Sequence, residues 1–286
     1  MGTTITNTAT ITDPNNPDVG DEDEVTTTVV PPGEDLWRQA FLIGRTVGEG
    51  ARPIVPQGNI TRAEVATIFF RLIEDDVRAR FWRQTNPFDD VTIDRWFNNA
   101  ISTTHNLGLF DWIDGNSFAP DQDITRGELA AVLVHFMNRD QIGPFAASFS
   151  LGDEFNDVAN HWAREFINEA AREGWIMGDT INGVPTGTFR PNEPINRAET
   201  AAMINRLFDR LVESADELLD DMISWHDNNN PNAWYFVYIY MATNSFYYEW
   251  GNNGYMDLIE VRAPREWSVL ERPNSRPGDI LTSYVR

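Results

Sequence analysis

The stretch "ITRAEVATIFFRLI", residues 60–73, carries the signals that decide this fold. Thr61 and Glu64 stand three residues apart directly before a run of apolar residues with helical periodicity, which is the reciprocal capping box that begins a helix. Arg62 lies between them in the first turn, where a cation opposes the helix dipole at a cost of about 0.3–1 kcal/mol. The stretch therefore predicts a capped helix whose first turn holds an unfavourably placed arginine.

The same arrangement occurs twice more, in "ITRGELAAVLVHFM" at residues 124–137 and "INRAETAAMINRLF" at residues 195–208. Each copy has a Thr or Asn cap, an arginine directly after it, and a glutamate two residues later. The three sets are Thr61, Arg62 and Glu64; Thr125, Arg126 and Glu128; and Asn196, Arg197 and Glu199. Apolar residues follow at matching places, so we expect each helix to bury one face.

A second signature alternates with the first. An aromatic residue is followed two positions later by an aspartate, and a tryptophan then opens another amphipathic stretch. The copies are "FDDVTIDRWFNNAI" at 88–101, "FNDVANHWAREFI" at 155–167 and a looser "WHDNNNPNAWYFVYI" at 225–239. The third copy lies beyond the last capped helix, and none precedes the first. This order predicts a closed assembly in which the C-terminal unit completes the N-terminal one.

The first 35 residues differ in character from the rest. Residues 3–12 and 25–30 alternate as strands do, and an acidic, turn-rich loop separates them. Because two strands alone are marginally stable in water, we interpret residues 1–30 as the last strands of an extracellular β-sandwich domain whose other strands are missing. Residues 31–35, "PPGED", are expected to form a linker.

Composition excludes several functions. The formal charge of −22 disfavours binding to nucleic acid phosphates, and no stretch approaches the roughly 20 apolar residues of a membrane span. With no cysteine and four histidines that form no H-E-x-x-H pair, we expect neither a metal site nor a cofactor. All 22 basic residues are arginine, which reflects either genomic composition bias or the ability of arginine to pair carboxylates with two hydrogen bonds.

The repeated motifs resemble those of the S-layer homology (SLH) family, a bacterial cell-wall-anchoring module that usually occurs in three copies. The resemblance rests on F-x-D-V with its tryptophan, on a glycine-containing turn that ends in T-F-x-P, and on I-T-R-A-E before a helix. The turns here read "DGNSFAPDQDITRGE" at 114–128, "TGTFRPNEPINRAE" at 186–199 and a diverged "GARPIVPQGNITRAE" at 50–64. The similarity covers roughly residues 36–250.

The resemblance implies a mainly α fold: a pseudo-threefold bundle of three helix-loop-helix SLH repeats, preceded by the β-hairpin fragment. We expect repeats at 36–85, 86–150 and 151–212, and a C-terminal closing segment at 213–286. The family's function is not catalytic. Its members bind secondary cell-wall polysaccharide attached to peptidoglycan, commonly a pyruvate-ketal-bearing and therefore anionic glycan, in grooves between repeats. The expected location is secreted, on the cell wall or S-layer.

The groove residues implied by the resemblance are arginines, aspartates, turn glycines and tryptophans. They are Arg62, Arg126, Arg197, Asp90, Asp157, Asp227, Gly44, Gly178, Trp96, Trp162 and Trp234. Trp112 falls where the second repeat should have its glycine, so we expect a bulky ring to close the second groove, which the sequence assigns to Arg126. Gly127 replaces the usual alanine, at some cost in helix propensity.

Each set of residues has two readings. An anion beside a helix N-terminus is attracted by free backbone N–H groups, and Arg62 would then clamp it; alternatively Arg62 pairs with acids of its own repeat or with Asp227 and staples the bundle. Likewise Asp90 and Asp157 are expected to cap the helices that follow them, and the tryptophans either pack or stack on sugar.

Two other functions remain open at the level of sequence. The chain is either the anchor portion of a surface glycoside hydrolase, which would need two carboxylates about 5–9.5 Å apart, or a lateral S-layer self-assembly module. In the latter case the aromatic segment after residue 234 would provide the contact surface.

Overall fold

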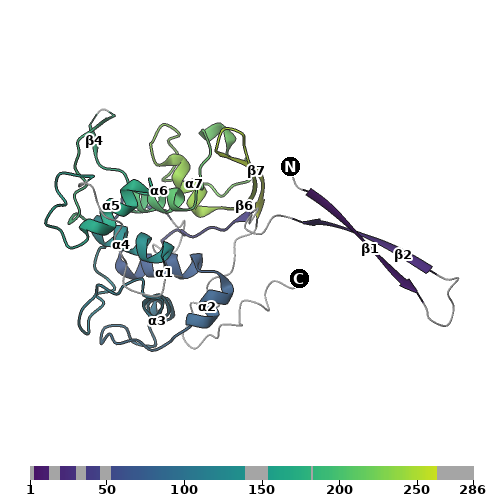
Figure 1. Cartoon of the computed structure of the whole chain (residues 1–286). Coiled ribbons are helices and arrows are strands. Elements are labelled where there is room, and N and C mark those ends of the chain that lie inside the picture. Colours follow the sequence, from purple (N-terminus) through teal and green to yellow (C-terminus); the bar gives the residue numbers. More distant parts are fainter. Residues whose placement is uncertain are drawn as a thin grey trace. The chain divides into compact units, whose positions relative to one another are not determined.

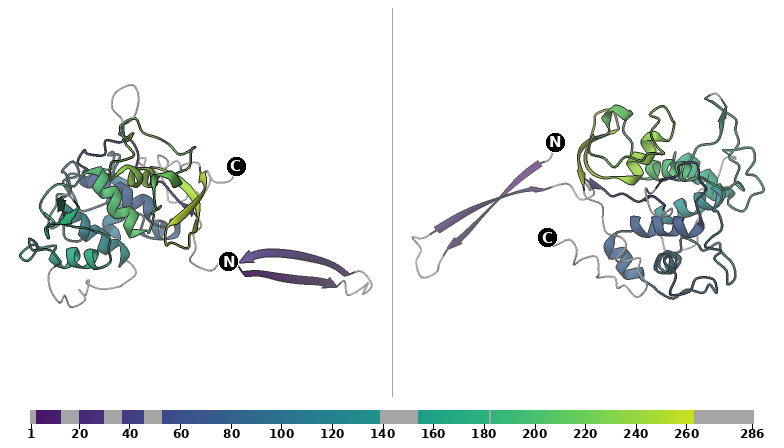
Figure 2. Two further views of the ribbon diagram at one scale, coloured as in Figure 1. Left: turned by 90° about the horizontal axis from the view of Figure 1, so that it is seen from above. Right: turned by 180° about the vertical axis from the view of Figure 1, so that it is seen from behind.

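The computed structural model describes residues 3–12, 20–29, 37–45, 53–138, 154–181 and 183–262. The chain divides into two compact units, Met1–Trp37 and Arg38–Arg286. In the first unit, β1 (Thr3–Thr12) pairs antiparallel with β2 (Gly20–Val29), and both views of Figure 2 show it as a twisted ribbon. The predicted hairpin is confirmed. Its second strand begins at Gly20 rather than at residue 25, because the acidic run Asp21–Glu24 continues the ladder opposite Thr8–Ile11.

The described part of the second unit is mainly helical, as predicted (Figure 1). Its helices are α1 (Arg62–Leu72), α2 (Asp75–Phe81), α3 (Asn98–Asn106), α4 (Arg126–Met137), α5 (Arg164–Arg172), α6 (Arg197–Leu207) and α7 (Phe236–Thr243), with a 3-10 turn at Ala215–Glu217. Its strands are β3 (Trp37–Arg38), β4 (Thr180–Ile181), β5 (Val184–Pro185), β6 (Ser245–Trp250) and β7 (Met256–Arg262). The sheet order is β3-β6-β7, and β4 pairs with β5. None of these helices has the length and hydropathy of a membrane span.

Capping boxes begin α1, α4 and α6, as the sequence predicts. In α1 the Thr61 hydroxyl accepts a hydrogen bond from the Glu64 N–H at 3.3 Å, and the Glu64 carboxylate accepts one from the Thr61 N–H at 2.9 Å. The same reciprocal pair occurs at the starts of α4 and α6. The local sequence therefore fixes where these helices start, and the motif arginine is the first residue of each.

The helices pack in pairs that follow the two alternating signatures. Helix α1 lies against α3, α4 against α5, and α6 against α7. Each capped helix thus contacts the helix that follows the next signature tryptophan, which is Trp96, Trp162 or Trp234. Phenylalanine rings fill the space between pairs: the Phe69 and Phe136 centroids are 5.1 Å apart, and those of Phe136 and Phe208 are 5.7 Å apart.

Three buried isoleucines directly before the helix caps form a closed ring of backbone hydrogen bonds. The N–H of Ile60 donates to the carbonyl of Ile195 (3.2 Å), that of Ile195 to Ile124 (3.0 Å), and that of Ile124 to Ile60 (3.0 Å). Since every member both donates and accepts, the ring has no open end. It joins residues far apart in the sequence at one place in the core.

The first backbone N–H groups of the capped helices also donate hydrogen bonds to carbonyls of neighbouring repeats. In α1 the N–H groups of Arg62 and Ala63 donate to the carbonyls of Gln122 and Pro120, which precede α4. The starts of α4 and α6 repeat this pattern in the same rotational sense. The bonds run from Arg126 to Glu193, Gly127 to Pro191, Arg197 to Gly58 and Ala198 to Pro56.

The C-terminal segment is tied to the beginning of the unit. The N–H groups of Phe41 and Leu42 both donate to the carbonyl of Ala242, at the end of α7. Arg210 is fully buried, with its guanidinium over the rings of Phe41 and Phe246, and burial lowers its pKa to about 9. These contacts place the last elements of the unit against its first described residues.

Candidate functional site

The three signature aspartates hold turns rather than helix N-termini. Each carboxylate accepts hydrogen bonds from two consecutive backbone N–H groups, at 2.7–3.1 Å. The pairs are Asp90 with Phe118 and Ala119, Asp157 with Phe189 and Arg190, and Asp227 with Ile54 and Val55. The predicted capping by Asp90 and Asp157 is therefore wrong, and α3 and α5 have no side-chain cap.

These turns need the support because their second residue has a left-handed backbone without being glycine. The φ angles of Val55, Ala119 and Arg190 are 52°, 54° and 55°. Such conformations are strained for residues with a Cβ, and two hydrogen bonds to a carboxylate offset the strain. Asp90 and Asp157 each accept these hydrogen bonds from a turn of their own repeat. The turn at Val55 receives its carboxylate from Asp227, in the C-terminal segment, so this turn depends on residues far along the chain.

The motif arginines pair with the capping glutamate of a neighbouring unit. The guanidinium-to-carboxylate distances are 2.5 Å from Arg62 to Glu128, 2.9 Å from Arg126 to Glu199, and 3.3 Å from Arg197 to Glu64. Together the three pairs form a cycle through all three capped helices. Pairing within one repeat or with Asp227, which the sequence allowed, is wrong for these arginines.

Each motif arginine also donates to a backbone carbonyl of the turn beside it. Arg62 reaches the carbonyl of Phe118 at 2.9 Å, and Arg126 reaches that of Phe189 at 2.6 Å. Arg197 donates to the carbonyls of Ile54 and Ile43, at 2.7 and 2.5 Å, and burial lowers its pKa to about 10. This environment favours the stapling role. The helix N–H groups beside the arginines are occupied too, so an anion held by free N–H groups there is excluded.

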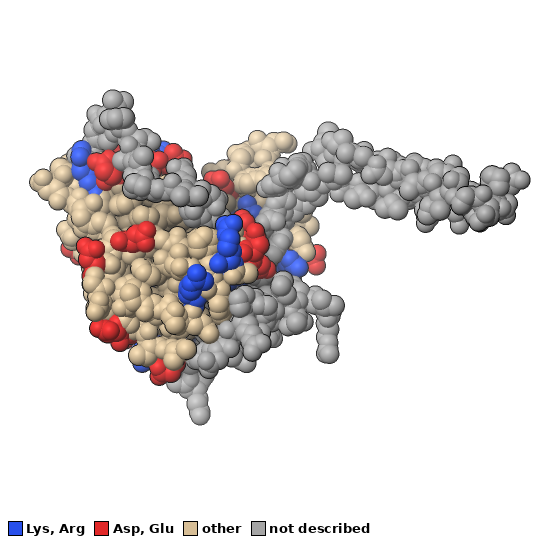
Figure 3. Space-filling model, turned by 60° about the horizontal axis from the view of Figure 1, so that its bottom comes forward, with Lys and Arg blue, Asp and Glu red and all other residues tan. Residues whose placement is uncertain are grey.

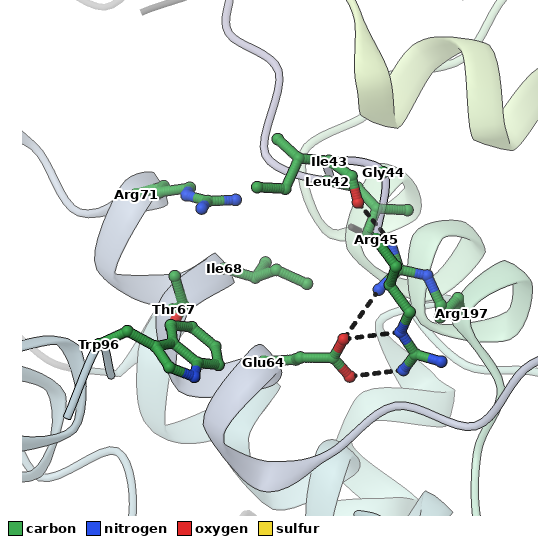
Figure 4. A pocket seen from close by; sticks show the side chains of 10 residues that line it. All are labelled: Leu42, Ile43, Gly44, Arg45, Glu64, Thr67, Ile68, Arg71, Trp96 and Arg197. Carbon is green, nitrogen blue, oxygen red and sulfur yellow. Dashed lines mark hydrogen bonds and ion pairs between the residues drawn. The ribbon is translucent and has the colours of Figure 1, made fainter. Parts of the chain in front are cut away.

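A pocket of about 440 Å³ lies where four chain segments meet (Figure 4). One face of α1, the segment 42–45, Trp96 before α3, and Arg197 from α6 form its walls. The lining residues are Leu42, Ile43, Gly44, Arg45, Glu64, Thr67, Ile68, Arg71, Trp96 and Arg197. Figure 4 shows Trp96 and Arg71 at one end of the pocket, with Arg45 and Arg197 meeting Glu64 at the other.

The charges of this pocket oppose those of the chain as a whole. Three guanidinium groups line it beside a single carboxylate, whereas acidic side chains are spread widely over the face seen in Figure 3. Arg45 holds Glu64 through two hydrogen bonds, of 2.9 and 2.7 Å. Burial acts to raise the pKa of Glu64, but hydrogen bonds from Arg45 and Thr61 and the charge of Arg197 outweigh burial and leave that pKa below its ordinary value. The pocket therefore keeps a net positive charge.

The pocket also has apolar walls at its mouth. Ile43 is 53% exposed and Trp96 is 50% exposed, although both side chains are large and hydrophobic. Half-exposed apolar side chains of this kind can pack against the apolar face of a ligand, and guanidinium groups bind carboxylates with charge-assisted hydrogen bonds. The arrangement can thus hold a molecule that has an anionic group and an apolar face.

Two of the predicted turn positions carry glycine, and the third carries Trp112. A Cβ on Gly178 would lie 2.6 Å from the Phe155 ring and 2.7 Å from the carbonyl of Thr188, so the close approach there requires glycine. Gly44 lines the pocket. Trp112 instead stacks on Trp162, with ring centroids 5.6 Å apart and an angle of 28° between the planes.

Trp112 lies in the groove where Arg62 pairs with Glu128, not in the groove where Arg126 pairs with Glu199. Its ring is 5.9 Å from the ring of His135 on α4, the helix whose Glu128 pairs with Arg62. Arg126 instead donates to the carbonyl of Met177, next to Gly178, at 3.4 Å. The sequence assigned Trp112 and Arg126 to one groove because they belong to one repeat; in the structure that assignment is wrong, since each arginine crosses to a neighbouring unit.

The three signature tryptophans occupy matching positions, and each is about half exposed. Trp96 lines the pocket and packs edge-on against Phe97. Trp162 stacks on Trp112, and Trp234 makes edge-on contacts with two tyrosines that follow it. All three therefore pack on one side and present the other side to solvent.

Comparison with known proteins identifies the repeat. The family model of the S-layer homology domain matches residues 87–130 and 154–201. These two segments are similar to S-layer homology domains. Both matched SLH segments contain the Phe-x-Asp…Trp signature, the turn that its aspartate holds, and the start of the next capped helix, which is the combination that builds one groove wall.

Curated relatives are similar to just over half of the chain. It is 36% identical over 159 residues to "Cell surface glycoprotein 1" of Acetivibrio thermocellus, covering 54% of this chain and 7% of that protein. It is 34% identical over 155 residues to the "Cellulosome-anchoring protein" of the same organism, covering 54% and 33%. It is 32% identical over 163 residues to the "Surface-layer 125 kDa protein" of Lysinibacillus sphaericus, covering 56% and 12%. The chain thus matches a third or less of the length of these proteins.

One departure from the usual SLH motif has a spatial cause. Gly127 stands where the other two repeats have alanine, and a Cβ there would lie 2.8 Å from the ring of His161 and 3.0 Å from the carbonyl of Pro191. His161 is held in place by Asn192, at 3.1 Å. The glycine makes room for this ring, which is a reason that helix propensity alone does not reveal.

The sequence did not identify two basic residues of the pocket, Arg45 and Arg71. Arg45 directly follows Gly44, and Arg71 lies seven residues after Glu64 on α1. Seven residues are two helical turns, so Glu64 and Arg71 share one face of the helix. That spacing was available in the sequence as a signal. It was overlooked because the repeated motif directed attention to Arg62.

Proposed function

We propose that the chain is a non-catalytic anchor that holds a larger protein at the bacterial cell wall by binding an anionic secondary cell-wall polysaccharide. The observation that carries this proposal is the pocket between α1 and Trp96, where Arg45, Arg71 and Arg197 face a half-exposed indole. Relatives that share the SLH repeats are named as cell-surface and anchoring proteins. The proposed location is accordingly the cell wall or S-layer.

The pocket chemistry suits a carboxylate-bearing sugar such as a pyruvate ketal. A guanidinium group binds a carboxylate in a planar, bidentate geometry, and an indole face packs on the C–H groups of a sugar ring. The net charge of −22 does not prevent approach, because repulsion beyond about 8 Å is largely screened at physiological ionic strength. Contact is then decided by the local arginines.

The proposed architecture is a pseudo-threefold bundle of SLH repeats at 36–85, 86–150 and 151–212, closed by residues 213–286. The isoleucine ring, the arginine cycle and the three aspartate-held turns support it, since each recurs once per unit in the same rotational sense. Residues 1–30 are proposed to be the end of a preceding β-domain, joined by the linker 31–35.

Several of the expected groove residues act in this proposal by holding other groups in position rather than by contacting the ligand. Arg62, Arg126, Arg197 and the signature aspartates hold the groove walls, whereas Trp96 and Gly44 line the pocket itself. Glycoside hydrolysis needs two suitably spaced carboxyl groups. The pocket offers only Glu64, which two guanidinium groups hold in its charged form, so a hydrolytic role for this site is disfavoured.

Sedimentation with purified cell walls tests the proposal. The protein should pellet with intact walls and remain in solution with walls from which the secondary polymer has been chemically removed. Equal retention by stripped peptidoglycan would show that the polymer is not the ligand. Sedimentation velocity at several concentrations without walls addresses the alternative, since a self-assembly module would associate in the absence of glycan.

A further inference from the structure

We infer that, among the three corresponding grooves of the described structure, the chain binds its anionic glycan only in the pocket between α1 and Trp96, because aromatic rings fill the second groove and carboxylates line the third. This inference rests on the proposed function. We call the pocket the first groove. The second groove is the corresponding place between α4 and Trp162, and the third is that between α6 and Trp234.

The residue four positions after each tryptophan decides how much room a groove has. In the first groove this residue is Ala100 of α3, which is buried beside Phe70 of α1. Because alanine has no ring, no aromatic side chain enters the groove from this position. In the second groove it is Phe166, whose ring centroid lies 5.0 Å from that of His135. In the third it is Tyr238, whose ring lies 5.1 Å from the guanidinium of Arg206.

The same comparison locates the basic residue of each groove. Arg71, His135 and Arg206 stand at matching places, seven residues after the capping glutamate of their helices. In the third groove Tyr238 covers the arginine and accepts a hydrogen bond from it at 3.1 Å. In the second groove burial lowers the pKa of His135 and so disfavours its charged form. Arg71 lines the open pocket and donates a hydrogen bond to the carbonyl of Phe41 at 3.1 Å.

The turn position adds a second difference. Gly44 leaves the first groove open, while Trp112 occupies the second groove and stacks on Trp162. Gly178 is present in the third groove, but the residue after it is Asp179 where the first groove has Arg45. Asp179 holds Arg190 through hydrogen bonds of 2.5 and 2.7 Å. A carboxylate at this place repels an anionic ligand.

Charge balance therefore differs among the grooves. The first has three guanidinium groups for one carboxylate. In the second, Arg62 is paired with Glu128, and burial lowers the pKa of the neighbouring His135, which disfavours its charged form. In the third, a cavity of about 470 Å³ lies beside Arg206, but Glu173, Asp209 and Glu213 line it with that single guanidinium. Among the grooves that the structure describes, the first is therefore the one that combines open space with an excess of positive charge.

Isothermal titration calorimetry with a pyruvate-ketal methyl glycoside measures the number of sites directly. The wild-type chain should bind one equivalent, and the neutral methyl ester of the same glycoside should not bind. Arg71→Ala and Arg45→Ala should each weaken binding by about ten- to a hundredfold, the value of one charge-assisted hydrogen bond. Arg45 is partly exposed on the segment before α1, so its variant keeps the test valid if Arg71→Ala unfolds.

Arg206→Ala is the matched control, because Arg206 occupies the same helical position in the third groove and should not affect affinity. Tyr238→Ala combined with Asp179→Arg gives the opposite test: the two changes recreate the alanine and the arginine of the first groove, uncover Arg206, remove the repelling carboxylate, and should raise the stoichiometry from one to two. A wild-type stoichiometry of two or three would overturn the inference. So would an unchanged affinity in both Arg45→Ala and Arg71→Ala.

The outcomes separate this inference from the proposed function. A chain that sediments with intact walls but binds several equivalents, or binds walls and ignores the carboxylated glycoside, refutes the single anionic site and leaves wall anchoring in place. A chain that neither sediments with intact walls nor binds the glycoside refutes both.

Discussion

Replacing Arg197 with alanine tests whether the motif arginines staple the bundle. The side chain is buried and makes two hydrogen bonds to carbonyls, of Ile54 and Ile43, and an ion pair with Glu64. Removing one partner of a buried charged network costs about 3–5 kcal/mol, because the remaining groups lose their partners without regaining water. At about 2–4 °C per kcal/mol for a unit of this size, the melting temperature should fall by roughly 6–20 °C.

Thermal unfolding followed by circular dichroism measures this fall, and urea unfolding gives the free energy independently. Arg190→Ala is the control, since the ion pair of Arg190 with Asp179 (2.5 Å) is shorter than that of Arg197 with Glu64 (3.3 Å), but Arg190 is 47% exposed and its removal should cost less than about 1 kcal/mol. A melting temperature for Arg197→Ala that matches wild type, together with lost glycan binding, would refute the stapling role and support direct binding of the anion by this arginine.

Four further outcomes are expected. Asp227→Ala should lower the unfolding free energy by about 1–3 kcal/mol in urea, because two turn N–H groups lose their acceptor. Glu64 and Asp90 have lowered pKa values in the folded state, so their stabilisation is present above their unfolded pKa values, 4.5 and 3.8, and is lost as pH falls through the folded values. Glu64→Gln should therefore make the unfolding free energy less dependent on pH between about 5 and 3, which acid titrations of both proteins would show. Truncation before Met222 removes α7, β6 and β7 and should abolish cooperative melting in calorimetry. Deletion of residues 1–30 should leave sedimentation with cell walls unchanged, and a large loss would contradict the proposed domain boundary.

Local chemistry made part of the fold predictable. The capping boxes placed the starts of α1, α4 and α6 correctly, since a Thr or Asn cap and its glutamate satisfy N–H groups within the same four residues. The aspartate-held turns were not predictable in this way. Asp227 binds the N–H groups of Ile54 and Val55, and no local pattern relates residues so far apart in the sequence.

The sequence predicted what kind of site to expect but not which residues form it. The sequence indicated that Trp112 would fill one groove, and its stack on Trp162 places a ring there. The sequence assigned that groove to Arg126 because a repeat groups residues that are neighbours in the chain, whereas the structure pairs Arg62 with Glu128 of the following unit. Arg45 escaped notice for a related reason, since it is specific to one groove and a repeat search keeps only what recurs.

The isoleucine ring has a consequence for how such a chain evolves and folds. Stacked-repeat proteins lengthen by adding one more unit at an end, because each unit contacts only its neighbours. Here the N–H of Ile60 requires the carbonyl of Ile195, so the first and last capped helices are themselves neighbours. A duplicated repeat would find no free hydrogen-bonding position in the ring, and loss of a repeat would leave a backbone donor and a backbone acceptor without partners. The first unit must also wait for the last to be synthesised before its turn at Val55 is held, so a ribosome-bound chain lacking residue 227 carries an unfinished first groove.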